Sequence, residues 1–578
     1  MDSITNALEV GSSYVFGLPL VVLILATGGF YTVRLLFPQV RRIPHSVSIT
    51  MGKYSKEADP GDVTHFQALC AALSATVGVG NIAGVATAIH AGGPGALFWM
   101  WVSGFLGMAL KYSECMLAQK YRVHHEDGTV SGGPMYYIER GLGPRFRWLA
   151  IMFASCGLVA TFGGGNMVQS NSVTIAFIDQ FALPKYHYDT PLSRLNGGKG
   201  ITRGGDAGFQ VNLRDGGSFV VKVAGAKTVR HLLDAINGHP SNRGCITASI
   251  APDENSIVLT DHTQGDGRFS LLPHGEGATL RELGFLKKGR ILNRVAEDNI
   301  TTVVPQKLIW RAIIGLFICG MVGAVIIGGI RRIGKVASRL VPVMGIIYVV
   351  SALVVIFWNV TEVPYAFYLI FKHAFTPTSA VGGFAGATVL YTINWGIKRA
   401  VFSNEAGLGS APIAHAAAKT KEPVREGLVA LIGPLVDTLI ICTMTGLVII
   451  ITGEWMGAAD SSILTKNAFS AGIPMVGGYI VTTGLILFAI STAISWSYYG
   501  DRCAMYLFGP VALIPYRWVY LAFLFLGAMT QLRFVWNFTD ITMGLMALPN
   551  LIALIALSPI VVYLTRDYFS RHHRRARR

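Results

Sequence analysis

Residues 74–81 read Ser74-Ala-Thr-Val-Gly-Val-Gly-Asn81, inside an apolar segment that runs from about Phe66 to Ile89. A helix in a membrane normally satisfies its own backbone groups, because lipid offers no hydrogen-bond partner. Two glycines beside a threonine and an asparagine favour local unwinding, which would free carbonyls for a cation and N–H groups for an anion. The alternative is a glycine-rich face for helix–helix packing, and the octet alone does not separate the two.

The composition of the whole chain is that of a membrane protein. The 578 residues are 52% hydrophobic and only 14% charged, and many apolar runs approach or exceed the length of a bilayer span. The net charge of +16 falls mainly in short loops between these runs, a pattern that indicates membrane topology and argues against nucleic-acid binding. The seven cysteines form no close pair, so we expect neither disulfides nor a structural zinc, and we expect no cleaved signal peptide.

Eleven apolar segments are expected to span the cytoplasmic membrane. They lie at about 14–36, 66–89, 95–117, 148–181, 308–330, 340–359, 380–401, 426–452, 474–499, 514–533 and 540–565. The basic clusters at 41–56, 120–122, 331–339 and 398–425 fit one orientation, with the N-terminus and residues 185–305 outside and the C-terminus inside. The predicted parts are an extra N-terminal helix with three core helices, an insert, seven further core helices and a basic tail, at residues 1–184, 185–305, 306–566 and 567–578.

Without the first span, ten core spans remain. The first and the sixth of these ten carry glycine-rich interruptions, at residues 74–81 and at Gly382-Gly-Phe-Ala-Gly386. Corresponding interruptions in two five-helix halves point to a secondary transporter built as an inverted repeat. The sequence therefore predicts an all-α polytopic membrane protein with a five-plus-five inverted-repeat fold, and it favours unwinding of the octet over simple packing.

Residues 185–305 differ sharply in composition from the rest of the chain, because they are polar, glycine-rich and too short of apolar residues to span a membrane. Short strands are predicted at 211–213, 218–223, 245–249 and 256–259, and a helix at 228–236 with Thr228 as its N-cap. These elements predict a small extracellular α+β module inserted into a loop.

Two polar clusters at membrane depth lie in the first half of the chain. In an unwound octet, the carbonyls of Ser74 and Val77 could face sodium, while the Gly80 N–H and the Asn81 side chain could face a carboxylate. Asn166 and Gln169 share a helix face near Asn171. These amides could reach a cavity or could form hydrogen bonds between helices.

Two further clusters lie in the second half. Thr392 and Trp395 share a helix face, offering a hydroxyl and an aromatic lid over a small side chain, although a structural tryptophan is an equal alternative. Ser491 and Thr492, followed by Ser495, carry hydroxyl oxygens that suit a hard cation. Such hydroxyls also commonly bond to carbonyls of their own helix.

Charged residues within the apolar segments are a second class of candidates. Lys111 and Glu114 could form an i,i+3 pair. Asp437 could support sodium or proton coupling, or could simply bond to a neighbouring helix. Arg399 and Glu405 are expected to belong to an inner-gate or structural network rather than to bind substrate.

Several motifs together resemble the alanine/glycine:cation symporter family. They are Phe66-Gln-Ala-Leu, Thr76-Val-Gly-Val-Gly-Asn-Ile-Ala-Gly-Val85, Gly132-Gly-Pro-Met-Tyr-Tyr, Gly382-Gly-Phe-Ala-Gly and Phe402-Ser-Asn-Glu-Ala-Gly-Leu-Gly-Ser. The resemblance implies a five-plus-five fold, sodium or sometimes proton coupling, and small neutral amino acids as substrates. It implies substrate contacts at Thr76, Gly80, Asn81, Gln169, Thr392 and Trp395, and a sodium site at Ser74, Val77, Ser491 and Thr492.

The insert resembles something different. Pro191-Leu-Ser-Arg-Leu-Asn-Gly-Gly-Lys-Gly200 and Thr228-Val-Arg-His-Leu-Leu-Asp-Ala-Ile-Asn237 are similar to a repeat of flagellar cap and hook-associated proteins. No flagellar role follows from this resemblance. The insert could be an extracellular lid, a contact for another protein, or a neutral insertion.

The function expected from these observations is sodium-coupled symport of alanine, glycine or a similar amino acid by alternating access. The alternative is an amino-acid sensor whose insert contacts a partner. An enzyme is not expected, because no catalytic set of carboxylates, histidines or nucleophiles gathers at one membrane depth. The expected partners are the amino acid, sodium as co-transported ion and the lipid bilayer, with no nucleic acid.

Overall fold

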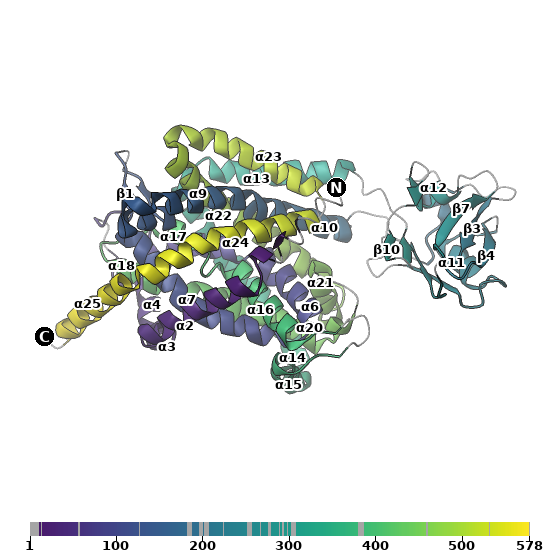
Figure 1. The fold of residues 1–578 in the computed structure, drawn as a ribbon, viewed down its shortest axis with the longest axis horizontal. Coiled ribbons are helices and arrows are strands. Elements are labelled where there is room, and N and C mark those ends of the chain that lie inside the picture. The colour runs from purple at the N-terminus through teal and green to yellow at the C-terminus, as the bar shows by residue number, and fades with distance from the viewer. Residues whose placement is uncertain are drawn as a thin grey trace. The chain divides into compact units, whose positions relative to one another are not determined.

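The structure, a computed structural model, describes residues 8, 11–12, 14–55, 58–126, 128–181, 188–195, 200–201, 207–223, 225–250, 257–265, 267–274, 279–287, 290–291, 294–296, 299–301, 308–379, 386–457, 461–530 and 532–576. The chain forms two compact units (Figure 1). Residues 1–180 and 311–578 form the helical unit, and residues 181–310 form the insert unit.

The helical unit is built from helices, most of which follow the predicted apolar segments. In its first part these are α2 (Leu18–Arg34), α4 (Ile43–Thr50), α5 (His65–Thr76), α6 (Val85–Gly92), α7 (Ala96–Lys120), α9 (Arg147–Phe162) and α10 (Val168–Phe181). In its second part they are α13 (Leu308–Ile326), α14 (Gly329–Trp358), α15 (Val363–Phe375), α16 (Val389–Asn404), α17 (Ala411–His415), α18 (Pro423–Ala430), α20 (Thr443–Ile451), α21 (Ser461–Gly472), α22 (Gly477–Phe508), α23 (Leu513–Met529), α24 (Leu532–Ala556) and α25 (Ser558–Ala576). Of these, α4, α15, α17 and α21 lie between the predicted apolar segments.

Apolar helices long enough to cross a membrane make this a multi-pass membrane protein. Among the described residues, six uninterrupted helical segments meet this condition, and the bent pair α5–α6 would make a seventh. The helices at Leu18–Arg34 and Trp310–Ile326 are apolar but shorter. The segments containing α14 and α23 bury only 28% of their most apolar window inside the protein, so most of that surface is left for lipid.

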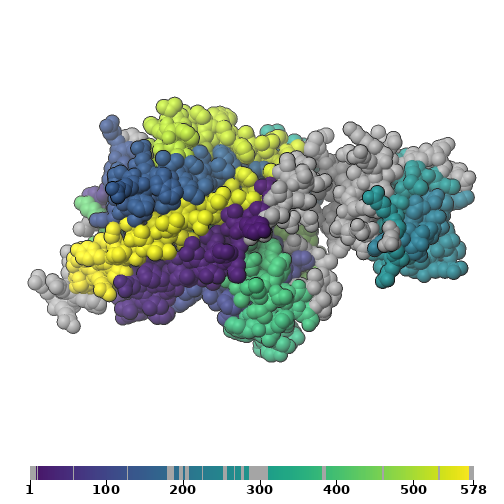
Figure 2. Space-filling model, in the orientation of Figure 1, coloured from purple at the N-terminus to yellow at the C-terminus, as the bar shows by residue number. Residues whose placement is uncertain are grey.

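One face of the helical unit shows how the N-terminal helix is held. There α2 packs along α24 (Figure 2). The buried hydroxyl of Tyr31 on α2 donates a hydrogen bond to the Leu554 carbonyl, at 2.5 Å. The first apolar helix is therefore part of the packed unit rather than a loose anchor.

Two predicted boundaries in the helical unit are wrong. Residues 331–339, expected as a basic loop, lie in the first turns of α14, and the turn between α13 and α14 is only Ile327–Gly328. Gly329 has a φ of +62°, which glycine adopts without strain and which allows so tight a turn. The last predicted span, 540–565, is divided between α24 and α25, where Ser558-Pro559 starts a new helix.

The insert unit contains the strands and helix that its sequence predicts. The predicted strands correspond to β3 (Gly208–Asn212), β4 (Ser218–Lys222), β5 (Ile246–Ile250) and β6 (Ile257–Asp261). Two further antiparallel neighbours were not expected, β7 (Ser270–His274) beside β3 and β11 (Asn299–Thr301) beside β6. The helix is α11 (Val229–Asn237), and the Thr228 hydroxyl accepts from the His231 N–H as the predicted N-cap. Its apolar face joins a separate buried core.

Candidate functional site

The predicted interruption of the octet is present. Helix α5 starts with a capping box between Thr64 and Gln67 and ends at Thr76. Val77 leaves the helical conformation with φ −74° and ψ 89°, and Gly80–Gly84 forms a π-helical turn that leads into α6. The two halves meet at an angle of 51°. We call Val77 and Gly78 the break.

The break frees one backbone carbonyl in particular. In a continuous helix the Gly78 N–H would bond to the Ser74 carbonyl, four residues earlier. Here the Gly78 N–H donates to Asn81 Oδ1 at 2.8 Å instead. The Ser74 carbonyl accepts from the Thr492 hydroxyl of α22 at 3.0 Å, and the Ser74 hydroxyl donates to the Ser491 carbonyl at 2.7 Å. The unwound segment is thus tied to α22.

A buried polar network fixes the conformation of the break from the other side. Asn81 Nδ2 donates to Asp437 Oδ1 at 2.7 Å and to the Asp437 carbonyl at 3.1 Å. The same carboxylate accepts from the hydroxyls of Ser403, at 3.0 Å, and Thr438, at 2.7 Å. Both ends of the Asn81 amide are therefore engaged within the protein, and Asp437 forms the bond to a neighbouring helix that was one of its two predicted roles.

Gly78 is the point where three elements meet. A Cβ built at Gly78 would lie 2.4 Å from Thr492 Oγ1 and 3.5 Å from Gln169 Oε1. Gln169 Nε2 donates to the carbonyl of Gly164, within the π-helical turn Gly163–Met167, at 2.7 Å. Among the described residues, Gln169 Oε1 is buried without a hydrogen-bond partner. The structure therefore brings Gln169 and the four residues of the predicted sodium site to one buried place.

The other predicted amides serve helix packing. Asn166 Nδ2 donates to the Tyr520 carbonyl at 2.7 Å. Asn171 Nδ2 donates to the carbonyls of Gly527, at 2.9 Å, and Thr530, at 2.6 Å. These bonds connect α10 and its preceding turn to α23, which is the interhelical alternative for both residues. The Thr76 hydroxyl bonds to the Leu73 carbonyl of its own helix at 3.3 Å.

Helix α16 runs along the interrupted helix but places its predicted residues away from the break. A Cβ on Gly80 would meet the Ser403 backbone at 3.1 Å, whereas the Thr392 hydroxyl donates to the carbonyl of Gly92 at 2.7 Å. Thr392 and Ser403 are separated by about 16 Å along the helix. The half-buried Trp395 packs near the Arg399 guanidinium, 5.0 Å from its ring. The structure does not bring Thr392 and Trp395 to Gly80.

A glycine-rich interruption that the sequence did not predict follows α16. Residues 382–385 are outside the described residues, and α16 is continuous from Val389 to Asn404. The backbone leaves the helix at Glu405, with φ +56°, and then passes Gly407 and Gly409, also with positive φ. Here the buried Glu405 carboxylate accepts from Trp496 Nε1 at 2.8 Å and from the Ser410 hydroxyl. The Ser-Asn-Glu-Ala-Gly-Leu-Gly-Ser motif is thus a turn, and its two glycines were the signal.

The remaining charged candidates belong to separate networks. Among the described residues Lys111 forms no ion pair with Glu114, whose carboxylate accepts from Asn550 Nδ2 at 2.9 Å. Arg399 lies 3.9 Å from Asp540, which also pairs with Lys398 at 2.6 Å. Arg399 and Glu405 are therefore not partners of each other, and the first of them helps to hold α16 against α24.

Comparison with known proteins assigns a class to this arrangement. A family model described as "Sodium:alanine symporter family" matches residues 1–197 and 283–578. An uncharacterized transporter of Haemophilus influenzae is 38% identical over 99% of this chain and 97% of its own length. The sodium/alanine symporter AgcS of Methanococcus maripaludis is 36% identical over 96% and 95%, respectively. The probable sodium/glutamine symporter GlnT of Bacillus subtilis is 30% identical over 95% and 87%.

Proposed function

The chain belongs to the sodium:alanine symporter family, and we propose that it carries a small neutral amino acid, alanine or glycine, together with sodium across the cytoplasmic membrane. The family consists of transporters, so the expectation that the protein is not an enzyme is confirmed. The observation that carries the proposal is the hydrogen bonding of the Ser74 carbonyl. At the break this carbonyl loses its partner within the helix and accepts a hydrogen bond from the Thr492 hydroxyl instead.

The oxygen atoms around the break suit sodium as the coupling ion. Sodium is a hard cation that prefers oxygen ligands, as calcium and magnesium do. We propose that the carbonyls of Ser74 and Val77 and the hydroxyls of Ser491 and Thr492 hold it. The Thr492 hydroxyl now donates to the Ser74 carbonyl, so it would turn its hydrogen away when both oxygens face a cation.

The amino acid is proposed to bind on the other side of the break. Its carboxylate would meet N–H groups at the start of the π-helical turn, near Gly80, because a helix N-terminus favours negative charge. Gln169 Oε1, which is buried and without a partner among the described residues, could accept from the amino group. Because Thr392 and Trp395 lie nearer Gly92, we propose that they restrict side-chain size on the approach to the site.

Coupling follows if the loaded form is the one that changes sides. Sodium bound between the break and α22 would tie the two elements together and complete the substrate pocket. A ligand shifts a conformational equilibrium only by its difference in affinity for the two states. We also propose the eleven spans, the five-plus-five inverted repeat, and the outside N-terminus and inside C-terminus as the frame for this motion.

Uptake of labelled alanine into proteoliposomes tests the proposed function. Inward gradients of sodium, lithium or protons are imposed in turn, with potassium as the reference condition. We expect accumulation with sodium and little with the other cations, and competition by unlabelled glycine. Uptake that does not depend on any cation gradient would contradict the proposed coupling. Sodium-driven uptake of glutamine but not of alanine would change the assigned substrate to glutamine.

Exchanging Asn81 and Asp437 separates their geometric role from a role of the charge. Asp437→Asn removes one of the acceptors for three donors, and hydrogen bonds to a charged group contribute about 1.5–3 kcal/mol each. We expect this variant to lose at least about tenfold in uptake rate. The double variant Asn81→Asp with Asp437→Asn restores the side-chain pair in reverse but not the bond to the carbonyl of residue 437, so it should recover part of the rate. If it stays as inactive as the single variant, the reversed pair does not replace the carboxylate at position 437.

A sensor function is the second candidate, because the insert forms a compact unit with its own core. Replacing residues 190–303 by a short Gly/Ser linker should leave sodium-driven alanine uptake within about twofold of the wild-type rate, since the break and α22 lie outside that segment. The uptake assay above is the measurement. Alanine binding without uptake in the full-length chain would favour the sensor, and loss of uptake in a well-folded deletion would show that the insert takes part in transport.

A further inference from the structure

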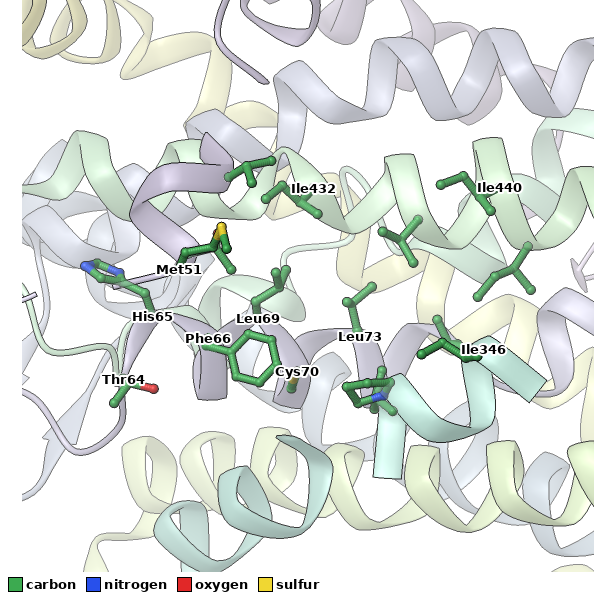
Figure 3. Close-up of a pocket in the computed structure, with 18 of the residues that line it drawn as sticks. Met51, Thr64, His65, Phe66, Leu69, Cys70, Leu73, Ile346, Ile432 and Ile440 are labelled. Carbon is green, nitrogen blue, oxygen red and sulfur yellow. The ribbon is translucent and has the colours of Figure 1, made fainter. Parts of the chain in front are cut away.

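A long groove lies between α5, α14 and the π-helical segment Leu435–Cys442, with α4 at one end (Figure 3). Its volume is about 1000 Å³. The groove is separate from the site around the break, and the two share only Val77, which is one of the residues that line the groove. Many of its side chains are apolar yet exposed, Ile346 by 62% and Phe66 by 42%.

The groove is polar at one end and apolar along the rest of its length. Thr50, Ser55, Thr64 and His65 line the end next to α4. In Figure 3, His65 and Thr64 lie at one end of the groove and Ile346 and Ile440 lie at the other. The walls beyond the polar end are almost entirely aliphatic. This polarity suits an elongated molecule with a polar head and a hydrocarbon tail.

Basic side chains continue the groove-lining face of α14 toward its N-terminus. Arg332, Lys335 and Arg339 are exposed, surround a second hollow, and have no carboxylate partner within the part of the chain that the structure describes. At about 100° per residue, they fall on the same helix face as Pro342 and Ile346, which line the groove. The opposite face packs on α5 through Gly334, next to Val63 and Gln67. The basic side chains and the apolar groove therefore follow one another along the same exposed face of α14.

We propose that this face binds one anionic phospholipid, with its phosphate on Arg332, Lys335 and Arg339 and an acyl chain in the groove. The three side chains carry positive charge, which matches the net negative charge of an anionic headgroup, whereas a zwitterionic headgroup has no net charge. Basic residues at a membrane surface attract anionic lipids. From Arg339 to Val350 the helix is about 16 Å long, which accommodates most of an acyl chain. An extended peptide would require polar partners for its backbone along its whole length, and the aliphatic walls offer none.

Lipid in this groove would lie directly against the half-helix that precedes the break. Leu69, Leu73 and Val77 of that segment all line it. The binding proposal stands independently of the proposed transport, since it rests on the shape and charge of α14 and α5. Its functional consequence rests on that transport, because a chain held beside α5 opposes any outward swing of this half-helix.

Photo-crosslinking tests the site directly. The purified full-length protein is reconstituted with a trace of phosphatidylglycerol that carries a diazirine at mid-chain, or with the matching phosphatidylcholine, and labelled peptides are identified by mass spectrometry. We expect phosphatidylglycerol to label peptides within 66–77, 341–350 or 432–441 at least about fivefold more than phosphatidylcholine does. Equal labelling by the two lipids would mean ordinary boundary lipid and would overturn the proposal.

Two pairs of variants locate the headgroup and the chain. The triple change Arg332→Gln, Lys335→Gln and Arg339→Gln should reduce phosphatidylglycerol labelling to the phosphatidylcholine level. Its control removes the same charge from exposed residues elsewhere, namely Lys120, Arg140 and Arg145. Gly345→Leu should reduce labelling by both lipids, because a Cβ at Gly345 meets open space in the groove, and Gly320→Leu is its control on α13. Labelling that is unchanged in the triple variant, or reduced equally in its control, contradicts the assignment.

Discussion

Gly78→Ala is expected to lower sodium-driven alanine uptake at least about 30-fold while the protein remains folded. The added Cβ would lie 2.4 Å from Thr492 Oγ1 and 3.5 Å from Gln169 Oε1, so α22 and the break must move apart. Overpacking by a methyl group costs about 1–3 kcal/mol, and 2 kcal/mol corresponds to a factor of about 30. The displaced atoms are those proposed to hold the ion and the amino acid, so the loss should appear in transport.

The matched control is Gly84→Ala, six residues farther along the same segment. A Cβ on Gly84 meets nothing within 4 Å, and its backbone is helical. Both variants are compared by the initial rate of labelled alanine uptake per amount of reconstituted protein, and by thermal unfolding in detergent. Wild-type uptake in Gly78→Ala, or an equal loss in Gly84→Ala, would show that the contact between Gly78 and Thr492 is not part of the transport site.

Thr492→Val is expected to raise the sodium concentration for half-maximal uptake at least about tenfold. Valine keeps the shape of threonine but removes the hydroxyl oxygen, so the proposed cation site loses one ligand. The Ser74 carbonyl also loses the hydroxyl donor that it now has at 3.0 Å. That lost donor affects the sodium-free state and opposes the shift, whereas the lost oxygen ligand weakens the sodium-bound state, and a tenfold shift corresponds to about 1.4 kcal/mol.

The control for this variant is Thr483→Val, an exposed threonine on the same helix. The alanine concentration is kept saturating while sodium is varied against potassium at constant ionic strength. A change in maximal rate with no change in sodium dependence would assign Thr492 to packing rather than to the ion. A shift in Thr483→Val as large as in Thr492→Val would point to a general effect on α22.

The interruption at the octet could be predicted because its causes are local. Gly78 and Gly80 lower the cost of leaving a helix, and Asn81 can cap the freed Gly78 N–H from three residues away. The strands and the helix of the insert could be predicted for the same reason, since alternating apolar residues and the Thr228 cap are local features of the sequence. Local signals of this kind also place most of the apolar helices.

The partners of these residues could not be predicted, because they come from distant parts of the chain. Asn81 bonds to Asp437, and the sequence places them 356 positions apart. The second turn lies at Glu405–Ser410, where Trp496 completes the hydrogen bonds of Glu405. The glycines of that turn give a local signal for a bend, but they do not reveal Trp496 as a partner.

The start of α14 illustrates a different limit. Basic residues mark the end of a span in the topology rule, but the rule says nothing about where the helix itself ends. Arg331, Arg332 and Lys335 are good helix formers, and the helix continues through them to Gly329. The charge pattern predicts a loop, whereas the structure has the first turns of a helix there.

Hydrogen–deuterium exchange of the peptide covering residues 74–84 tests the central claim most directly, since that claim is that groups released at the break bind the ion and the amino acid. The reconstituted protein is compared in sodium with alanine, in sodium alone and in potassium, with a peptide of α14 as internal reference. We predict that exchange at 74–84 slows in sodium and slows further with alanine, while the reference stays unchanged. Identical exchange at 74–84 in all three conditions, in protein that takes up alanine, would contradict the account.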